Sequence, residues 1–171
     1  FTTIQEESMI DRIIFPIKDI RGKTVVFQGR HQLSDAKPKY INYPSGVELP
    51  IYPINFGSRY TSVVFVEGIF DMLNLQDKGL KNCSCVFGTS TLQKDTAKKL
   101  LPLKVQGITK VYLLFDNDTP GIQAAEKLKP LIEACELEVE IINLDDSCSD
   151  PGELPQSYVD SIREYVCKEN T

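Results

Sequence analysis

The hydrophobic pattern of the chain changes character at about residue 60. Before that point, residues 11–29 hold two runs of β-branched and aromatic residues around a turn containing Gly22, a pattern that predicts a β-hairpin. Residues 31–60 carry four prolines and no helical periodicity, so we expect an irregular, extended stretch there. The pattern therefore predicts a small β-rich lobe over residues 1–60.

From residue 61 onward, short apolar runs alternate with segments of helical periodicity. Strands are predicted at 63–66, 83–87, 111–115 and 137–143, and helices from 69 to about 79, at 92–101, at 121–134 and at 157–166. Pro102 is expected to end the second of these helices. Regular alternation of strand and helix predicts an α/β domain over residues 61–171, built on a mainly parallel sheet flanked by helices.

Composition narrows the class of protein. The chain has no run near the 18 or so apolar residues of a membrane span and no signal-peptide pattern at its start, so we expect a cytoplasmic protein without membrane association. It begins with Phe1 rather than methionine, so we expect that it is processed or cut from a longer polypeptide. The five cysteines include no C-x-x-C pair and have only His31 as a nitrogen partner, so no zinc site is expected. Cys83 and Cys85 are expected to be buried, reduced thiols.

The charge is unevenly distributed. A net charge of −5 argues against a surface coated in basic residues for nonspecific binding of nucleic acid. Seven basic residues nevertheless crowd the first forty positions: Arg12, Lys18, Arg21, Lys23, Arg30, Lys37 and Lys39. Positive and negative charge are therefore partly segregated along the chain.

Acidic residues follow three of the four predicted strands. Glu67 follows the first, with Asp71 one helical turn later, Asp116 and Asp118 follow the third, and Asp150 lies beyond the fourth. Ligands of open α/β sheets bind beyond the carboxyl ends of the strands, so these carboxylates should meet at one edge. Clustered carboxylates repel unless a cation neutralises them, and Mg²⁺ prefers hard oxygen ligands. The pattern predicts a magnesium site, in which Mn²⁺ could substitute.

Each acidic group also has a simpler interpretation. An aspartate after a strand often caps the next helix, and Asp118 or Thr119 ahead of Pro120 fits an N-cap with proline at the first helical position. The segment around Asp150 could equally be an ordinary acidic loop. Three acidic groups at successive positions along the sheet edge are harder to explain in this way than any one of them.

The order of these motifs resembles the Toprim domain of bacterial and phage DnaG-type primases. The matching blocks are Val-Phe-Val-Glu67-Gly68-Ile-Phe-Asp71, Phe87-Gly88-Thr89-Ser90-Thr91, Leu-Leu-Phe-Asp116-Asn-Asp118-Thr-Pro-Gly121 and Asp150-Pro-Gly-Glu-Leu154. Upstream, Arg12-Ile-Ile-Phe-Pro-Ile, Phe27-Gln-Gly-Arg30 and Pro38-Lys39-Tyr40-Ile41-Asn42 look like blocks of the lobe that precedes Toprim in the same family. The resemblance covers residues 10 to 155, and its specificity lies in the ordered set.

The resemblance implies a DNA primase catalytic core, which synthesises short RNA primers from ribonucleoside triphosphates on single-stranded DNA. It implies that Asp116, Asp118 and Asp150 are metal ligands, and that Glu67 is a general acid/base or a metal-adjacent carboxylate. Asp71 would support this cluster. Residues implied to bind nucleotide or template phosphates are Arg30, Lys39 and Asn42, and Tyr40 beside Lys39 also suits contact with nucleic acid.

The chain departs from the family pattern in two respects. The family commonly has a second aspartate two residues after the Asp150 position, where this chain has Gly152, so Glu153 could compensate or one metal could be held more weakly. DnaG-type primases also usually carry a zinc-binding domain and a part that interacts with the replicative helicase. Neither is visible in this sequence, so the helicase would be bound through parts absent here.

Two other functions compete with primase activity. The segment ending in Phe-Asp116-Asn-Asp118-Thr119 resembles the nucleophile motif of haloacid-dehalogenase-type phosphatases, in which Asp116 would be phosphorylated and Glu67 would have no role. The motif lies late in the chain for that family. Gly152 and the net negative charge also fit a non-catalytic Toprim module that binds nucleic acid or a replication partner.

Overall fold

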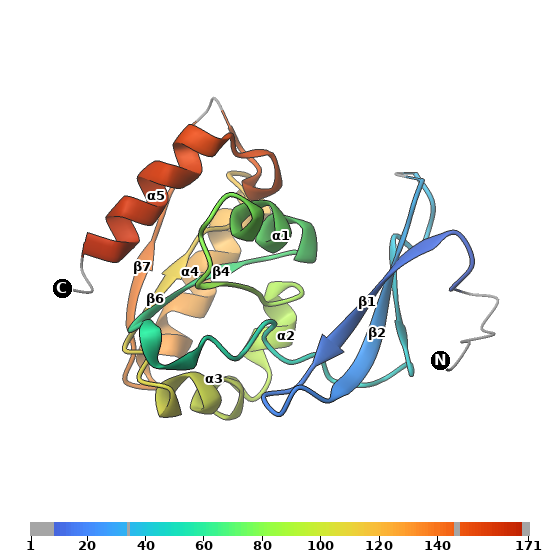
Figure 1. The fold of residues 1–171 in the computed structure, drawn as a ribbon, viewed down its shortest axis with the longest axis horizontal. Helices are drawn as coiled ribbons and strands as arrows, with labels where there is room; N and C mark the ends of the chain where they lie inside the picture. The colour runs from blue at the N-terminus through green and yellow to red at the C-terminus, as the bar shows by residue number, and fades with distance from the viewer. Residues whose placement is uncertain (1–8, 34, 146–147, 169–171) are drawn as a thin grey trace. The chain divides into compact units, whose positions relative to one another are not determined.

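The computed structural model describes residues 9–33, 35–145 and 148–168, which form two compact units, Phe1–Pro50 and Ile51–Thr171 (Figure 1). The second unit begins at Ile51 rather than at residue 61. Ile51 and Ile54 are buried in the hydrophobic core of the second unit, and Tyr52 exchanges two backbone hydrogen bonds with Cys85. The extended segment before Tyr60 therefore packs as part of the second unit.

The first unit is an antiparallel sheet in the order β1-β2-β3. Its strands are β1 (Arg12–Lys18), β2 (Thr24–His31) and β3 (Tyr40–Tyr43), and the pairing of β1 with β2 confirms the predicted hairpin. Asp19 Oδ1 accepts hydrogen bonds from two backbone N–H groups of the hairpin turn. The prediction of an irregular stretch was wrong at β3, because Pro38 and Pro44 lie outside the residues that pair with β2.

The second unit is a four-stranded parallel sheet in the order β5-β4-β6-β7, which confirms the predicted fold class. The strands are β4 (Ser62–Val66), β5 (Cys83–Cys85), β6 (Lys110–Leu113) and β7 (Glu138–Ile141). Every residue of β4 is buried, as expected for a central strand covered on both faces. Cys83 and Cys85 are buried free thiols, and the other three cysteines are also free.

Helices cover both faces of this sheet. They are α1 (Ile69–Asp77), α2 (Thr89–Gln93), α3 (Thr96–Val105), α4 (Thr119–Glu133) and α5 (Gln156–Lys168), with short 3₁₀ turns η2 (Gly57–Arg59) and η3 (Pro151–Glu153). On one face, Val63 and Phe65 of β4 belong to the same core cluster as Leu103 of α3 and Leu128 of α4. On the other face, the ring of Tyr112 contacts that of Tyr165 from α5.

The predicted helix at 92–101 is two helices, α2 and α3. The break falls at Asp95, whose backbone is left-handed with φ 55°. Pro102 lies inside α3 and does not end it. Pro102 lacks an N–H donor, and the Gln106 side chain donates to the Pro102 carbonyl at 2.8 Å at the C-terminal end of α3.

None of the helices within the described residues is both long enough and apolar enough to cross a membrane.

Candidate metal centre

Parallel pairing brings the ends of β4 and β6 together. The backbone N–H of Leu114, just past β6, donates to the Phe65 carbonyl of β4 at 2.9 Å. Glu67 directly follows β4, and Asp116 lies three residues past the last residue of β6. Both side chains are partly buried, so the sheet places two carboxylates at the same edge with restricted access to water.

Asp71 is tied to the segment that carries Glu67. Its Oδ2 accepts a hydrogen bond from the Gly68 backbone N–H at 2.8 Å, which closes a capping interaction at the start of α1. The Glu67 carbonyl in turn accepts from the Gly88 N–H at 3.1 Å. The β4–α1 turn is therefore held from two sides, and Asp71 is hydrogen-bonded to the backbone of the residue that follows Glu67.

Asp118 is the N-cap of α4, as the simpler interpretation predicted. Its Oδ1 accepts from the Gly121 N–H at 2.7 Å. The helix begins at Thr119, so Pro120 occupies the second helical position rather than the first. A Cβ at Gly121 would collide with the Asp116 carbonyl oxygen, so only glycine allows this close approach. The cap uses Oδ1, and a carboxylate keeps a second oxygen that can bind a ligand.

The Asp150 segment is fastened to the same edge. The Asn117 N–H donates to the Ser149 carbonyl at 2.8 Å, and Asp150 Oδ1 accepts from the Gly152 N–H at 2.7 Å. A Cβ on Gly152 would lie 3.0 Å from Asp150 Oδ1 and 3.0 Å from Asp71 Oδ1. The carboxylates of Asp150 and Asp71 therefore both lie against Gly152. At the place where the family commonly has an aspartate side chain, this chain has the carboxylate of Asp71 close by. Glu153, by contrast, is exposed to solvent.

The carboxylates share one electrostatic environment. Burial raises the pKa of Asp116 to about 7, with further contributions from the charges of Asp71, Asp150, Glu67 and Asp118. Burial, then Asp118 and Asp71, also raises the pKa of Glu67. Each neighbouring charge that raises these two pKa values is itself a carboxylate, so the edge carries concentrated negative charge.

This donor set fits a hard divalent cation, although the ligands are not gathered into a finished shell. Within the described ranges, no group of three or more His, Cys, Asp or Glu side chains has the arrangement of a metal site. Carboxylates repel one another when no cation lies between them, so side chains that feel each other's charge can still stay apart. Oxygen ligands around Asp116 are the kind that Mg²⁺ and Mn²⁺ prefer.

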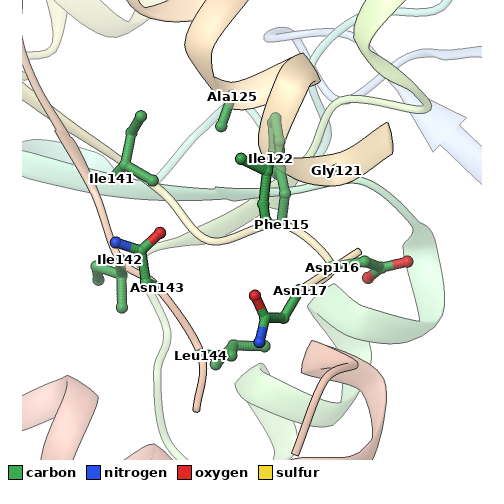
Figure 2. A pocket seen from close by; sticks show the side chains of 10 residues that line it. All are labelled: Phe115, Asp116, Asn117, Gly121, Ile122, Ala125, Ile141, Ile142, Asn143 and Leu144. Carbon is green, nitrogen blue, oxygen red and sulfur yellow. The ribbon is translucent and has the colours of Figure 1, made fainter. Parts of the chain in front are cut away.

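Asp116 also borders a small pocket (Figure 2). Its walls include Ile122 of α4 and Ile141 of β7, together with the amides of Asn117 and Asn143. Figure 2 shows the carboxylate of Asp116 directed away from Ile141 and Asn143. The carboxylate is therefore outside the apolar part of this pocket.

Three of the four predicted nucleotide-binding or template-binding residues share one face of the first sheet. Arg30 pairs with Tyr40 across β2 and β3, and two residues along, Gln28 pairs with Asn42. Arg30 Nη1 donates to the Tyr40 hydroxyl at 2.6 Å, and its guanidinium carbon lies 5.3 Å from the ring centroid. Gln28 donates to Asn42 Oδ1 at 3.3 Å. Arg30, Tyr40 and Asn42 thus form one row of polar side chains.

Lys39 is exposed just before β3, with its Nζ 6.0 Å from the Tyr40 ring centroid. Arg12 supports this segment and was missed as a site residue. Its guanidinium donates to the carbonyls of Pro38 at 2.9 Å, Lys39 at 3.2 Å and Gly29 at 3.3 Å. A single arginine on a strand carries no spacing signal, so only the pairing of the strands reveals this role.

Two family models match this chain, one on each unit. The family described as "Toprim-like" matches residues 64–154, and the one described as "DNA primase catalytic core, N-terminal domain" matches residues 5–49. The DNA primase of Aquifex aeolicus is 29% identical over 163 residues, which cover 91% of this chain and 32% of that protein. The DNA primase of Clostridium acetobutylicum is 34% identical over 153 residues, covering 84% of this chain and 24% of that protein.

Solved structures agree with this placement. The zinc-binding and RNA polymerase domains of Aquifex aeolicus primase superpose with a TM-score of 0.77 at 27% identity, covering 98% of this chain and 43% of that one. A DnaG primase catalytic domain bound to ssDNA has a TM-score of 0.63 at 23% identity, covering 93% of this chain and 51% of that one, and it shares the fold. The chain spans less than a third of the length of the two relatives compared by sequence. It belongs to the Toprim-like family, and its two units correspond to adjoining parts of the catalytic core of DnaG-type DNA primases.

Proposed function

We propose that this chain is the catalytic core of a DNA primase, which joins ribonucleotides into short RNA primers on a single-stranded DNA template with the help of Mg²⁺. The observation that carries the proposal is the cluster of carboxylates at the carboxyl ends of β4 and β6, joined by the Asp150 segment. Burial, together with the charges of four neighbouring carboxylates, raises the pKa of Asp116 to about 7. Such a concentration of charge is costly unless a cation offsets it.

Asp116, Asp118 and Asp150 would hold the cation, with Glu67 beside them. A bound divalent metal supplies Lewis-acid stabilisation of the charge that develops as a 3′ hydroxyl attacks an α-phosphate and pyrophosphate leaves. Burial, with the charges of Asp118 and Asp71, raises the pKa of Glu67, which makes its carboxylate a better proton acceptor than a free glutamate. Asp71 fixes the Gly68 backbone and so orients Glu67.

In the first unit, the row formed by Arg30, Tyr40 and Asn42, together with Lys39, would bind nucleotide or template. Arg30 offers a planar guanidinium for phosphate, and the ring of Tyr40 offers a face for base stacking. A primase catalytic domain of the same fold has been solved bound to ssDNA, which supports single-stranded DNA as the template. Binding to a replicative helicase would use parts outside this chain.

The electrostatic environment of Glu67 weighs against a phosphatase. In a haloacid-dehalogenase-type enzyme, Asp116 would be the nucleophile and Glu67 would have no role. Here the charges of Asp118 and Asp71 both act on Glu67, and Glu67 acts on Asp116, so the three acidic segments behave as one group.

Extension of an RNA primer already annealed to a single-stranded template tests the proposal without requiring initiation. Wild-type chain should extend the primer with Mg²⁺ or Mn²⁺ and ribonucleoside triphosphates. Asp116→Asn and Asp118→Asn should each lower the rate about 100-fold or more, because each removes a carboxylate that would hold the cation, and the cation would stabilise the charge of the transition state.

Asp160→Asn is the matched control, because Asp160 lies on α5 and pairs with Arg163 at 2.9 Å. It should extend primers at the wild-type rate. Metal-dependent extension that survives Asp116→Asn and Asp118→Asn would refute the proposal, whereas metal-independent binding of nucleic acid without extension would favour the non-catalytic module.

A further inference from the structure

We infer that Asn74 of α1 and Lys78, the residue directly after α1, form a clamp that positions Asp150 for metal binding. The inference rests on the proposed function, because it assigns a role to these two side chains only if the acidic edge binds a cation. Neither residue belongs to the motifs that identify the family, and neither reaches the carboxylates directly. They act on the backbone of the segment that carries Asp150, so they are positioning residues.

The clamp is built from side chain to backbone hydrogen bonds across a long sequence separation. Asn74 Nδ2 donates to the carbonyls of Pro151 at 2.9 Å and Leu154 at 3.2 Å. Lys78 Nζ donates to the same Leu154 carbonyl at 2.6 Å and also to Asn74 Oδ1. Gln156 extends the contact, because its Nε2 donates to the Lys78 carbonyl at 2.9 Å.

The clamp lies on the helical face that carries Asp71. Asn74 and Lys78 follow Asp71 by three and seven residues, and this spacing places all three on one side of α1. That side meets η3 in two places. Asp71 Oδ1 lies against Gly152, and the clamp holds the carbonyls on either side of Gly152.

Electrostatic repulsion explains why such a clamp is needed. Asp71 and Asp150 both place an oxygen 3.0 Å from the position that a Gly152 side chain would occupy, so two negative charges are held close together. Without a cation, like charges drive their segments apart. Hydrogen bonds from Asn74 and Lys78 to buried and partly buried backbone oppose that movement and keep Asp150 at the metal edge.

The test is to measure the affinity of the whole 171-residue chain for Mn²⁺ by electron paramagnetic resonance. Asn74→Leu keeps the side-chain volume and removes the donor, and it should weaken Mn²⁺ binding about 10-fold, as loss of an outer partner of a metal ligand commonly does. Lys78→Met should weaken binding in the same direction by about 3-fold. Both variants should keep a melting temperature close to that of Gln76→Leu.

Gln76→Leu is the matched control. Gln76 lies on the same helix and also donates a side-chain hydrogen bond to a backbone carbonyl, that of Cys83 at 2.8 Å, away from η3. It should leave Mn²⁺ affinity within about 2-fold of wild type. Equal weakening by Gln76→Leu, or unchanged affinity in both Asn74→Leu and Lys78→Met, would overturn the clamp. If the wild-type chain bound no Mn²⁺, or if Asp116→Asn did not abolish the binding, the proposed function itself would fail, and the inference with it.

Discussion

The two units place their polar residues in different ways. In the second unit, Glu67 and Asp116 lie beyond the ends of parallel strands, where the topology alone brings them to one edge. In the first unit, Arg30 and Tyr40 project from the faces of antiparallel strands, and the register of pairing decides which side chains meet. Residues at strand ends can be found from the hydrophobic pattern, whereas neighbours on a sheet face require the pairing to be known.

The largest effect on stability should come from Gly121→Ala. The added Cβ would collide with the Asp116 carbonyl oxygen, so we expect a loss of about 3 kcal/mol despite the better helix propensity of alanine. Urea unfolding followed by far-ultraviolet circular dichroism would measure it, since the chain contains no tryptophan.

Gly46→Ala in the first unit provides the contrast. Gly46 has φ +76° and open space around it, so only backbone strain opposes a side chain and the loss should be about 1 kcal/mol. Equal losses at the two glycines would contradict the idea that close approach to Asp116 sets the geometry of the second unit.

Arg12→Met should destabilise the first unit by about 2 kcal/mol, because it removes the charged donor to the carbonyls of Pro38 and Lys39 while keeping an aliphatic side chain. Amide hydrogen exchange would show faster exchange at His31, whose N–H donates to the Lys39 carbonyl. Arg21→Met, in the exposed hairpin turn, should change neither quantity. Faster exchange spread through the second unit would contradict a local role for Arg12.

The metal-free chain should lose stability as pH rises from about 4 to about 7. The pKa of Asp116 rises from 3.8 to about 7 on folding, so the folded state binds a proton more tightly than the unfolded state over this window. Stabilisation from that proton is complete below about pH 4 and is lost by about pH 7. Because the side chain is only partly buried, solvent screening reduces the effect to about 1.5 kcal/mol.

Asp116→Asn should remove this component of the pH dependence, and saturating Mg²⁺ should offset it in wild-type chain. Thermal unfolding at several pH values, with and without Mg²⁺, measures both. A wild-type curve that parallels that of Asp116→Asn would show that folding does not raise the pKa of Asp116.

The smallest effect should follow Tyr40→Phe, which removes the hydroxyl that accepts from Arg30 at 2.6 Å and leaves the ring. We expect a loss of about 0.5–1 kcal/mol in the stability of the first unit. Binding of single-stranded DNA, measured by fluorescence anisotropy, should change less than it does in Tyr40→Ala, which also removes the stacking surface. Identical binding by both variants would argue against stacking on Tyr40.

Most of the fold could be predicted because the apolar runs are short and regularly spaced. The four strands of the second unit and the hairpin of the first follow directly from them. Strand β3 could not be predicted in this way. Its four residues include no proline, but Pro38 and Pro44 on either side make the whole stretch look irregular. The division between α2 and α3 depends on the left-handed backbone of Asp95, which the residue pattern does not predict.

The site was predictable to the same extent. Acidic residues at strand ends can be recognised without any contact information, and Glu67, Asp116 and Asp118 share one electrostatic environment as that reasoning expects. Whether they bind metal is still a prediction. The approach of Asp71 to Gly152 could not be predicted, because it depends on where η3 packs against α1. The spacing of Asn74 and Lys78 from Asp71 was the only available signal for the clamp.

Anomalous diffraction from crystals soaked in Mn²⁺ tests the central claim most directly. The account predicts a metal bound by Asp150 together with Asp116 or Asp118, with the carboxylate of Glu67 facing it. Metal on Asp116 and Asp118 with Glu67 remote from it, or no metal at this edge of the sheet, would contradict the account.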